Sequence, residues 1–123
     1  MTYEEIVYAV RNLFENADAR AIHEHIAVQV NIVGEGAGIF YFEVAERQCC
    51  VEPYDYYDHD CLLTTTGDVL LEICKKKSGM RRGIEEGTIQ FEGNMKKLHL
   101  CLDNIVLPDS QKSKKKETKN DEG

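Results

Sequence analysis

The segment 26–45 carries the strongest structural pattern in this sequence: two strand-like runs joined by glycines. Residues 26–33 alternate apolar and more polar positions with a period of two, which is typical of a strand with one buried face. Residues 34–38 contain three glycines, which readily adopt the positive φ angles of a tight turn. Residues 39–45 are again apolar and aromatic, so the segment predicts a β-hairpin.

Other patterns place helices and further strands around this hairpin. Thr2 and Glu5 have the spacing of a capping box, and apolar residues at helical spacing follow them up to Phe14. Three consecutive strands joined by short turns favour antiparallel pairing, and the helices would then cover one face of the sheet. The predicted fold class is therefore α+β, a five-stranded sheet with helices packed on one face, in the order α-β-β-β-crossover-β-α-β-α. The later elements are expected as strands over 48–52, 61–65 and 88–92, helices over 68–77 and 95–105, and a short irregular helical turn over 80–86.

The chain length of 123 residues fits one domain. We expect that domain to span residues 1–107. Residues 108–123 are almost wholly polar and lysine-rich, a composition too poor in apolar residues to fold, and they predict a disordered tail.

Charge and cysteine usage exclude several classes of protein. The net charge is −7, and residues 1–74 contain three arginines and fourteen acidic residues, so the domain lacks the basic footprint that nucleic-acid binding requires. No apolar run approaches the length of a membrane span, and the acidic N-terminus does not resemble a signal peptide. Five cysteines, an odd number without a Cys-x-x-Cys pair, indicate reduced thiols and a cytoplasmic protein.

Positive charge gathers in one segment, over residues 75–97. Two interpretations remain open: a solvated helix end, or a surface that meets acidic lipid headgroups or makes transient contact with an anionic membrane. The basic residues of this segment are Lys75, Lys76, Lys77, Arg81, Arg82, Lys96 and Lys97.

Candidate chemical groups are scattered rather than arranged in a known motif. His23 and His25 form an H-x-H pair that lacks the third and fourth ligands of a metal site, and a surface role is equally consistent with their positions. Cys49, Cys50 and Cys61 lie on predicted strands, where buried structural thiols are common. The acidic, tyrosine-rich segment 54–60 is typical of a polar crossover loop. We predict no catalytic residue, no metal and no cofactor.

One stretch of sequence resembles a known family. Residues 87–95, Gly-Thr-Ile-Gln-Phe-Glu-Gly-Asn-Met, run into a helix with Leu98 and Leu102 and resemble the C-terminal signature of the sterol carrier protein 2 family. Residues 60–65 and the helix after them resemble the family's preceding strand and middle helix. The resemblance covers residues 60–105. The segment 76–82 departs from it because it lacks a proline, and the tyrosine-rich crossover is also unusual.

The resemblance implies an apolar tunnel for fatty acids, fatty acyl-CoA or sterol-like lipids, and hence a small soluble lipid carrier rather than an enzyme. Each buried CH₂ contributes about 0.8 kcal/mol, so a 16-carbon chain would gain on the order of 12 kcal/mol before costs. The expected ligand-binding residues are Val69, Ile73, Met80, Ile84, Ile89, Phe91, Met95, Leu98 and Leu102. The expected headgroup or membrane contacts are Lys76, Lys77, Arg81, Arg82, Lys96 and Lys97.

Two other classes of function stay open. The chain could be an interaction or dimerisation module that keeps the fold with a filled tunnel, or an accessory domain to a partner enzyme, and it could be a monomer or a homodimer. It could also be a small enzyme that uses the loop 54–60 with a cysteine. A continuous cavity of several hundred Å³ between the last helix and the sheet would favour the lipid carrier.

Overall fold

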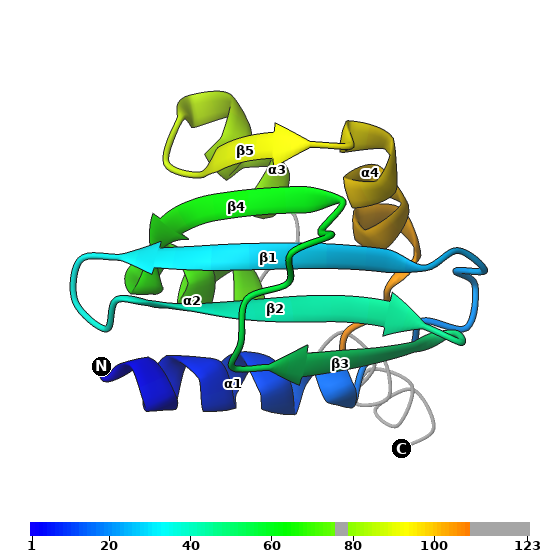
Figure 1. Cartoon of the computed structure of the whole chain (residues 1–123), viewed down its shortest axis with the longest axis horizontal. Helices are drawn as coiled ribbons and strands as arrows, with labels where there is room; N and C mark the ends of the chain where they lie inside the picture. Colours follow the sequence, from blue (N-terminus) through cyan, green and yellow to red (C-terminus); the bar gives the residue numbers. More distant parts are fainter. Residues whose placement is uncertain (76–78, 109–123) are drawn as a thin grey trace, which may run out of the picture.

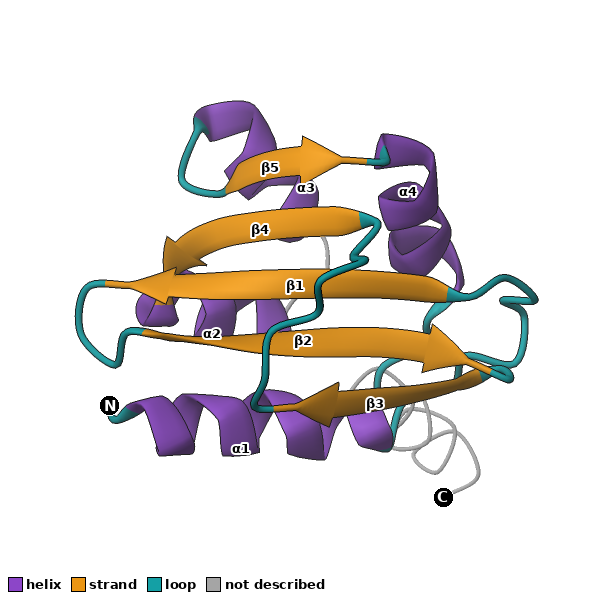
Figure 2. Cartoon of the chain, in the orientation of Figure 1, coloured by secondary structure: helices purple, strands orange, loops and turns teal. Residues whose placement is uncertain are grey.

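The computed structural model of the chain describes residues 1–75 and 79–108 (Figures 1 and 2). Lys76, Lys77 and nearly all of the predicted tail lie outside these residues. The helices and strands, in chain order, are α1 (Tyr3–Glu15), β1 (Ile26–Val33), β2 (Gly38–Ala45), β3 (Gln48–Glu52), β4 (Cys61–Thr66), α2 (Gly67–Lys75), α3 (Gly79–Glu86), β5 (Gln90–Gly93) and α4 (Met95–Asn104).

The five strands form one sheet in the order β3-β2-β1-β4-β5. The predicted hairpin is confirmed, with Ile26 opposite Val44 and Ile32 opposite Gly38. β3 also pairs antiparallel to β2, as expected, whereas β4 runs parallel to β1. The parallel pair requires the chain to cross the sheet between β3 and β4, and the polar crossover 53–60 does this. The α+β prediction is therefore confirmed.

The two faces of the sheet are covered differently. All four helices lie behind the sheet in Figure 1, whereas the crossover runs in front of β1 and β2. The side chains of β2 alternate accordingly: Phe40, Phe42 and Val44 are buried toward the helices, and Tyr41 and Glu43 point to the crossover face. We call these the helix face and the crossover face. The apolar core lies on the helix face, which is the face that the period-two pattern assigns to burial.

Helix α1 begins at the capping box that the sequence predicts. The Thr2 hydroxyl accepts the Glu5 backbone N–H at 3.1 Å, and the Thr2 N–H donates to the Glu5 carboxylate at 2.8 Å. The pKa of Glu5 is lowered because its ionised form accepts this backbone hydrogen bond. Ile6, Val7 and Val10 form the buried side of the helix.

Helix α1 also covers the outer edge of β3. The backbone carbonyl of Val51 accepts a hydrogen bond from Arg11 Nε at 3.0 Å, and the Val51 N–H donates to the Glu15 carboxylate at 3.3 Å. Arg11 lies 3.8 Å from Glu15 and 3.4 Å from Glu52. An edge strand presents unpaired backbone groups to other chains, and here two side chains of α1 occupy those of Val51.

The main departures from the predicted elements are in the second half. The irregular turn over 80–86 is a regular helix, α3, and β5 begins at Gln90, two residues later than expected. Helix α3 packs closely on Ile89, the residue before β5, because Gly83 has no Cβ: one built there would lie 2.5 Å from the Ile89 side chain. Within residues 1–75 and 79–108, no helix is long and apolar enough to cross a membrane.

Candidate functional site

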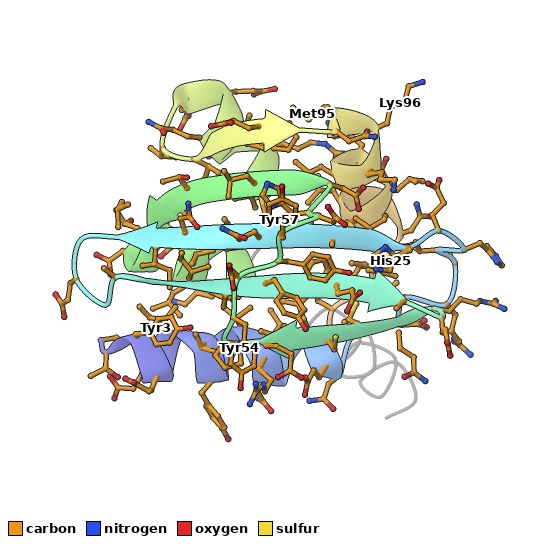
Figure 3. All side chains as sticks on the ribbon, in the orientation of Figure 1. Tyr3, His25, Tyr54, Tyr57, Met95 and Lys96 are labelled. Atoms are coloured by element: carbon orange, nitrogen blue, oxygen red, sulfur yellow. The ribbon has the colours of Figure 1, made fainter. Side chains whose placement is uncertain are left out.

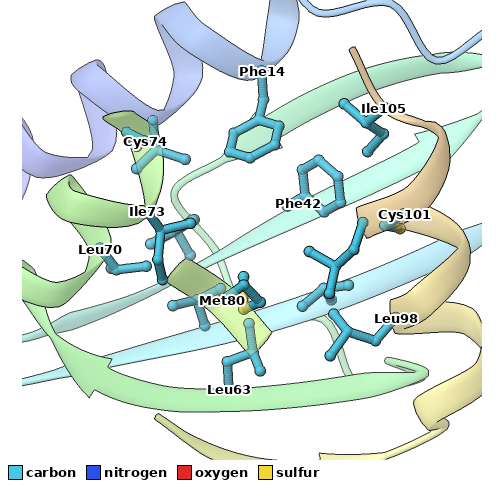
Figure 4. A pocket seen from close by; sticks show the side chains of 15 residues that line it. Phe14, Phe42, Leu63, Leu70, Ile73, Cys74, Met80, Leu98, Cys101 and Ile105 are labelled. Atoms are coloured by element: carbon cyan, nitrogen blue, oxygen red, sulfur yellow. The ribbon is translucent and has the colours of Figure 1, made fainter. Parts of the chain in front are cut away.

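The interior between the sheet and the four helices contains one strongly apolar cavity, of about 60 Å³ (Figure 4). Aliphatic side chains from β1, β4, α2 and α4 form much of its wall. The more polarizable or aromatic residues that line it are Phe14, Phe40, Phe42, Cys74, Met80 and Cys101. The rings of Phe14 and Phe42 meet edge to face, with centroids 4.9 Å apart.

Four of the nine residues expected to bind a ligand line this cavity: Ile73, Met80, Leu98 and Leu102. Ile89 is buried but packs against Gly83, and Phe91 and Ile84 lie half-buried at the side of the core. Val69 lines a separate groove between α2 and α3. The Met95 side chain is 37% exposed at the start of α4, next to Lys96 (Figure 3).

The sequence analysis missed the cavity residues from the first half of the chain. Phe40 and Phe42 come from β2, Val28 and Val30 from β1, and Val10 and Phe14 from α1. A signal for them was present, because they occupy the buried positions of the period-two pattern and the apolar stripe of the first helix. Only the folded arrangement shows that these faces enclose the same space as α4.

The cavity is far smaller than a lipid-binding tunnel. Binding sites for small molecules commonly enclose 300–1,000 Å³, so 60 Å³ does not hold an acyl chain without rearrangement. Its apolar lining offers water no hydrogen-bond partner, and apolar cavities of this kind stay dry. Among the described residues, no buried side-chain nitrogen or oxygen lacks a hydrogen-bond partner. The interior therefore presents only apolar contacts to anything that enters it.

Four of the five cysteine thiols have a raised pKa. Burial raises the pKa of Cys49 to about 12 and that of Cys61 and Cys74 to about 11. The pKa of Cys50 is also raised to about 11, first by burial and then by the negative charge of Glu43. These four thiols are neutral at pH 7, which is unfavourable for nucleophilic attack.

A polar network holds the crossover to its face of the sheet. Glu43 of β2 accepts a hydrogen bond from the Tyr56 hydroxyl at 3.0 Å, and His25 Nε2 lies 2.5 Å from the same carboxylate oxygen. The Tyr56 N–H donates to Gln29 Oε1 of β1 at 2.9 Å. Partial burial opposes ionisation of Glu43, but the hydrogen bonds from His25 and Tyr56 outweigh it and lower its pKa.

The end of the crossover is held by Asp60. One carboxylate oxygen accepts the Ala27 N–H at 2.9 Å, and the other lies 3.0 Å from the Lys97 ammonium of α4. Lys97 also donates to the His25 carbonyl at 3.1 Å. Partial burial opposes ionisation of Asp60, yet the bonds from Ala27 and Lys97 prevail and lower its pKa. Asp60 thus ties the crossover to β1 and, through Lys97, to α4.

Four of the six expected headgroup contacts lie among the described residues, and their surroundings differ. Arg81 forms a 2.5 Å ion pair with Asp103, and Lys97 is paired with Asp60. Arg82 lines the groove between α2 and α3, whereas Lys96 projects into solvent at the start of α4 (Figure 3).

The histidines show no arrangement for a metal. His25 is paired with Glu43, and His59 Nδ1 lies 2.8 Å from the Tyr56 carbonyl oxygen. His23 and His99 are exposed. In the part of the chain that the structure describes, no group of three or more histidine, cysteine or acidic side chains is placed to hold a metal ion.

Comparison with known proteins gives a family and a fold. The family described as the SCP-2 sterol transfer family matches residues 11–100. No curated protein matches the sequence.

Several solved structures are similar to this one. A "UbiJ-SCP2 Ubiquinone synthesis protein" has a TM-score of 0.62 and 16% identity, over 82% of this chain and 90% of that one. The sterol carrier protein 2 like 2 of Aedes aegypti has a TM-score of 0.53 and 18% identity, over 81% and 89% of the two chains. The sec-alkylsulfatase Pisa1 from Pseudomonas sp. has a TM-score of 0.60 and 15% identity, over 71% of this chain but only 14% of the enzyme. At these identities the likeness concerns the fold.

Proposed function

Because the chain belongs to the SCP-2 sterol transfer family, we propose that it is a non-catalytic carrier of a hydrophobic ligand, a fatty acid, fatty acyl-CoA or sterol-like lipid. The observation that carries this proposal is the wholly apolar cavity between the helices and the sheet. Family membership supports lipid binding in general, and the raised thiol pKa values favour a role that involves no nucleophile. We place the carrier in the cytoplasm.

Binding requires the cavity to expand, and the helix face is suited to this. Helix α3 is short, and the buried residues it contributes are Met80 and Gly83, fewer than α1, α2 or α4 contribute. Met80 and the cavity cysteines are polarizable, and methionine adapts its shape at small cost. A 16-carbon chain gains on the order of 12 kcal/mol from burial before costs, and this gain is what would offset such a rearrangement.

In the expanded state the ligand would contact the present cavity lining first. We propose Ile73, Met80, Leu98 and Leu102 as primary contacts, together with the aromatic residues of β2. Val69, Ile84, Ile89 and Phe91 would join the wall only if α3 moves. Met95, Lys96 and Arg82 are proposed as outer contacts.

Two half-buried cysteines allow a direct test of ligand position. Cys74 lines the cavity, Cys50 lies on the crossover face, and both thiols have a pKa raised to about 11. We expect saturating palmitate to slow alkylation of Cys74 by iodoacetamide at least fivefold, measured by peptide mass spectrometry, and to leave Cys50 unchanged. The same protocol with palmitoyl-CoA and cholesterol ranks the ligand classes. A Cys74 alkylation rate that the ligand leaves unchanged, or no saturable binding of any of the three lipids, would contradict the proposal.

The small volume of the cavity favours a second candidate, an interaction or dimerisation module with a filled interior, alone or as an accessory domain. A stable dimer in sedimentation equilibrium, together with no binding of the three lipids, would support this function. A monomer that binds lipid would exclude it.

A further inference from the structure

Two surface grooves flank α2, and each shares one residue with the apolar cavity. The groove between α1 and α2 encloses about 670 Å³ and shares Cys74 with the cavity. The groove between α2 and α3 encloses about 350 Å³ and shares Ile73. Each shared side chain is therefore the partition between a groove and the interior, so an alkyl chain has two possible routes inward.

The two partitions differ in how open they are. Ile73 is buried, with only 4% of its surface exposed, although it lines both the α2/α3 groove and the cavity. Cys74 is smaller and only half-buried, in contact with both the groove and the cavity. In Figure 4, Cys74 stands next to Phe14 on the side of the cavity where α1 passes. Less side-chain volume must move to admit a chain past Cys74 than past Ile73.

The chemistry of the two grooves differs more strongly. Among the described residues that line the α2/α3 groove, the charged ones are Glu72, Glu86 and Arg82, so carboxylates outnumber cations there. The α1/α2 groove combines Ala9, Leu13, Leu71 and Cys74 with neutral polar side chains. Lys75 is the charged residue among the described residues that line it.

We propose that the ligand enters between α1 and α2, past Cys74, and that it is a single-chain amphiphile with an anionic headgroup, a carboxylate held over Lys75. This inference rests on the proposed lipid-carrier function. The apolar cavity offers no hydrogen-bond partner to a polar group, so the headgroup must stay in the groove. An anion is favoured beside Lys75 and disfavoured beside Glu72 and Glu86.

One feature limits the selectivity for the anion. Asn16, the C-terminal cap of α1, lines the same groove, and the partial negative charge at a helix C-terminus disfavours an anion. We therefore expect a carboxylate to be preferred over an uncharged group of the same chain length by only three- to fivefold.

Matched tryptophan substitutions in the two grooves test the route. Asn12 and Glu86 are both exposed helix residues, the first in the α1/α2 groove and the second in the α2/α3 groove. We expect Asn12→Trp to slow the association of cis-parinaric acid at least tenfold in stopped-flow fluorescence, and Glu86→Trp to change it less than twofold. Circular dichroism and thermal midpoints check that both variants fold, and Asn12→Phe replaces the first variant if it does not.

The headgroup is tested with Lys75→Gln and two probes of the same chain, cis-parinaric acid and its methyl ester. We expect the substitution to remove the three- to fivefold preference for the acid while leaving the affinity for the ester unchanged. An unchanged preference overturns the role of Lys75. If Glu86→Trp slows the association of cis-parinaric acid and Asn12→Trp does not, the proposed route is wrong. The proposed function is unaffected by that result, because the protein still binds the probe. No binding of either probe to the unmodified protein overturns both this inference and the proposed function.

Discussion

The two faces of the sheet are stabilised by different interactions, and this difference shows where the molecule can change shape. On the crossover face, Glu43 and Asp60 fix the segment 53–60 to β1 and β2 through directional hydrogen bonds. On the helix face, the main stabilising interaction is apolar packing around a 60 Å³ cavity. Hydrogen bonds lose strength steeply with distance and angle, whereas apolar contacts can be exchanged for a ligand. The crossover face is thus the rigid side and the helix face the adaptable one.

The largest expected effect comes from Leu98→Ala on the helix face. Leu98 is 2% exposed and lines the cavity, so truncation should lower the free energy of unfolding by about 3 kcal/mol. The matched control is Leu62→Ala, since Leu62 is only half-buried on the other face of β4, and it should cost about 1 kcal/mol. Urea denaturation measures both, and equal losses would show that the two faces depend on packing alike.

A somewhat smaller loss of unfolding free energy is expected from Asp60→Ala on the crossover face. The substitution leaves the Ala27 N–H and the Lys97 ammonium without this carboxylate, and we expect a cost of about 2 kcal/mol. Asp58→Ala, at an exposed position of the same segment, serves as the control and should stay within about 0.5 kcal/mol of the parent. If Asp60→Ala were as mild as its control, the crossover would not be the rigid side. Faster alkylation of Cys50 in Asp60→Ala would add that the whole crossover has loosened.

Tyr56→Phe should lower the free energy of unfolding by less, about 1 kcal/mol. It removes the hydroxyl that donates to Glu43 but keeps the ring that meets Tyr41 edge to face, with centroids 4.9 Å apart. Tyr57→Phe removes the same atom from a side chain that is 94% exposed and should be neutral in the same thermal or urea unfolding experiment. A neutral Tyr56→Phe would mean that His25 and the Cys50 thiol satisfy Glu43 without the Tyr56 hydroxyl.

The smallest expected effect on stability is that of lowering the pH. The pKa values of Glu43 and Asp60 are lowered in the folded protein, so each group stabilises it above the ordinary carboxyl pKa, near 4, and that contribution is lost as the pH falls through the lower, folded-state value. Urea midpoints measured from pH 6 to pH 3 should therefore decline less steeply in Glu43→Gln than in the parent. Parallel curves would indicate that Glu43 titrates alike in the folded and unfolded states.

The sequence predicted the features that local patterns control. The capping box at Thr2 and the hairpin over 26–45 are both present in the structure. The family signature after Gly87 also led to the correct fold class. These features need only the residues within a few positions of one another.

The parts that the sequence did not predict depend on distant segments. The parallel pairing of β1 with β4 follows from the path of the crossover, which Asp60 and Ala27 fix across the sheet. Helix α3 contains Gly79 and Gly83, which lower helix propensity, and it forms because Gly83 allows close packing on Ile89. The cavity likewise draws residues from both halves of the chain, so a search confined to residues 60–105 found only part of its wall.

The covering of β3 by Arg11 and Glu15 has a consequence for self-assembly. The sheet ends at β3 on one side and β5 on the other, and the α1 side chains already occupy the outward backbone groups of Val51 on the β3 side. A sheet that can be extended from one border only cannot propagate as a fibril. If two copies join along β5, the shared sheet has an Arg11–Glu15 border at both ends, and assembly terminates at a pair.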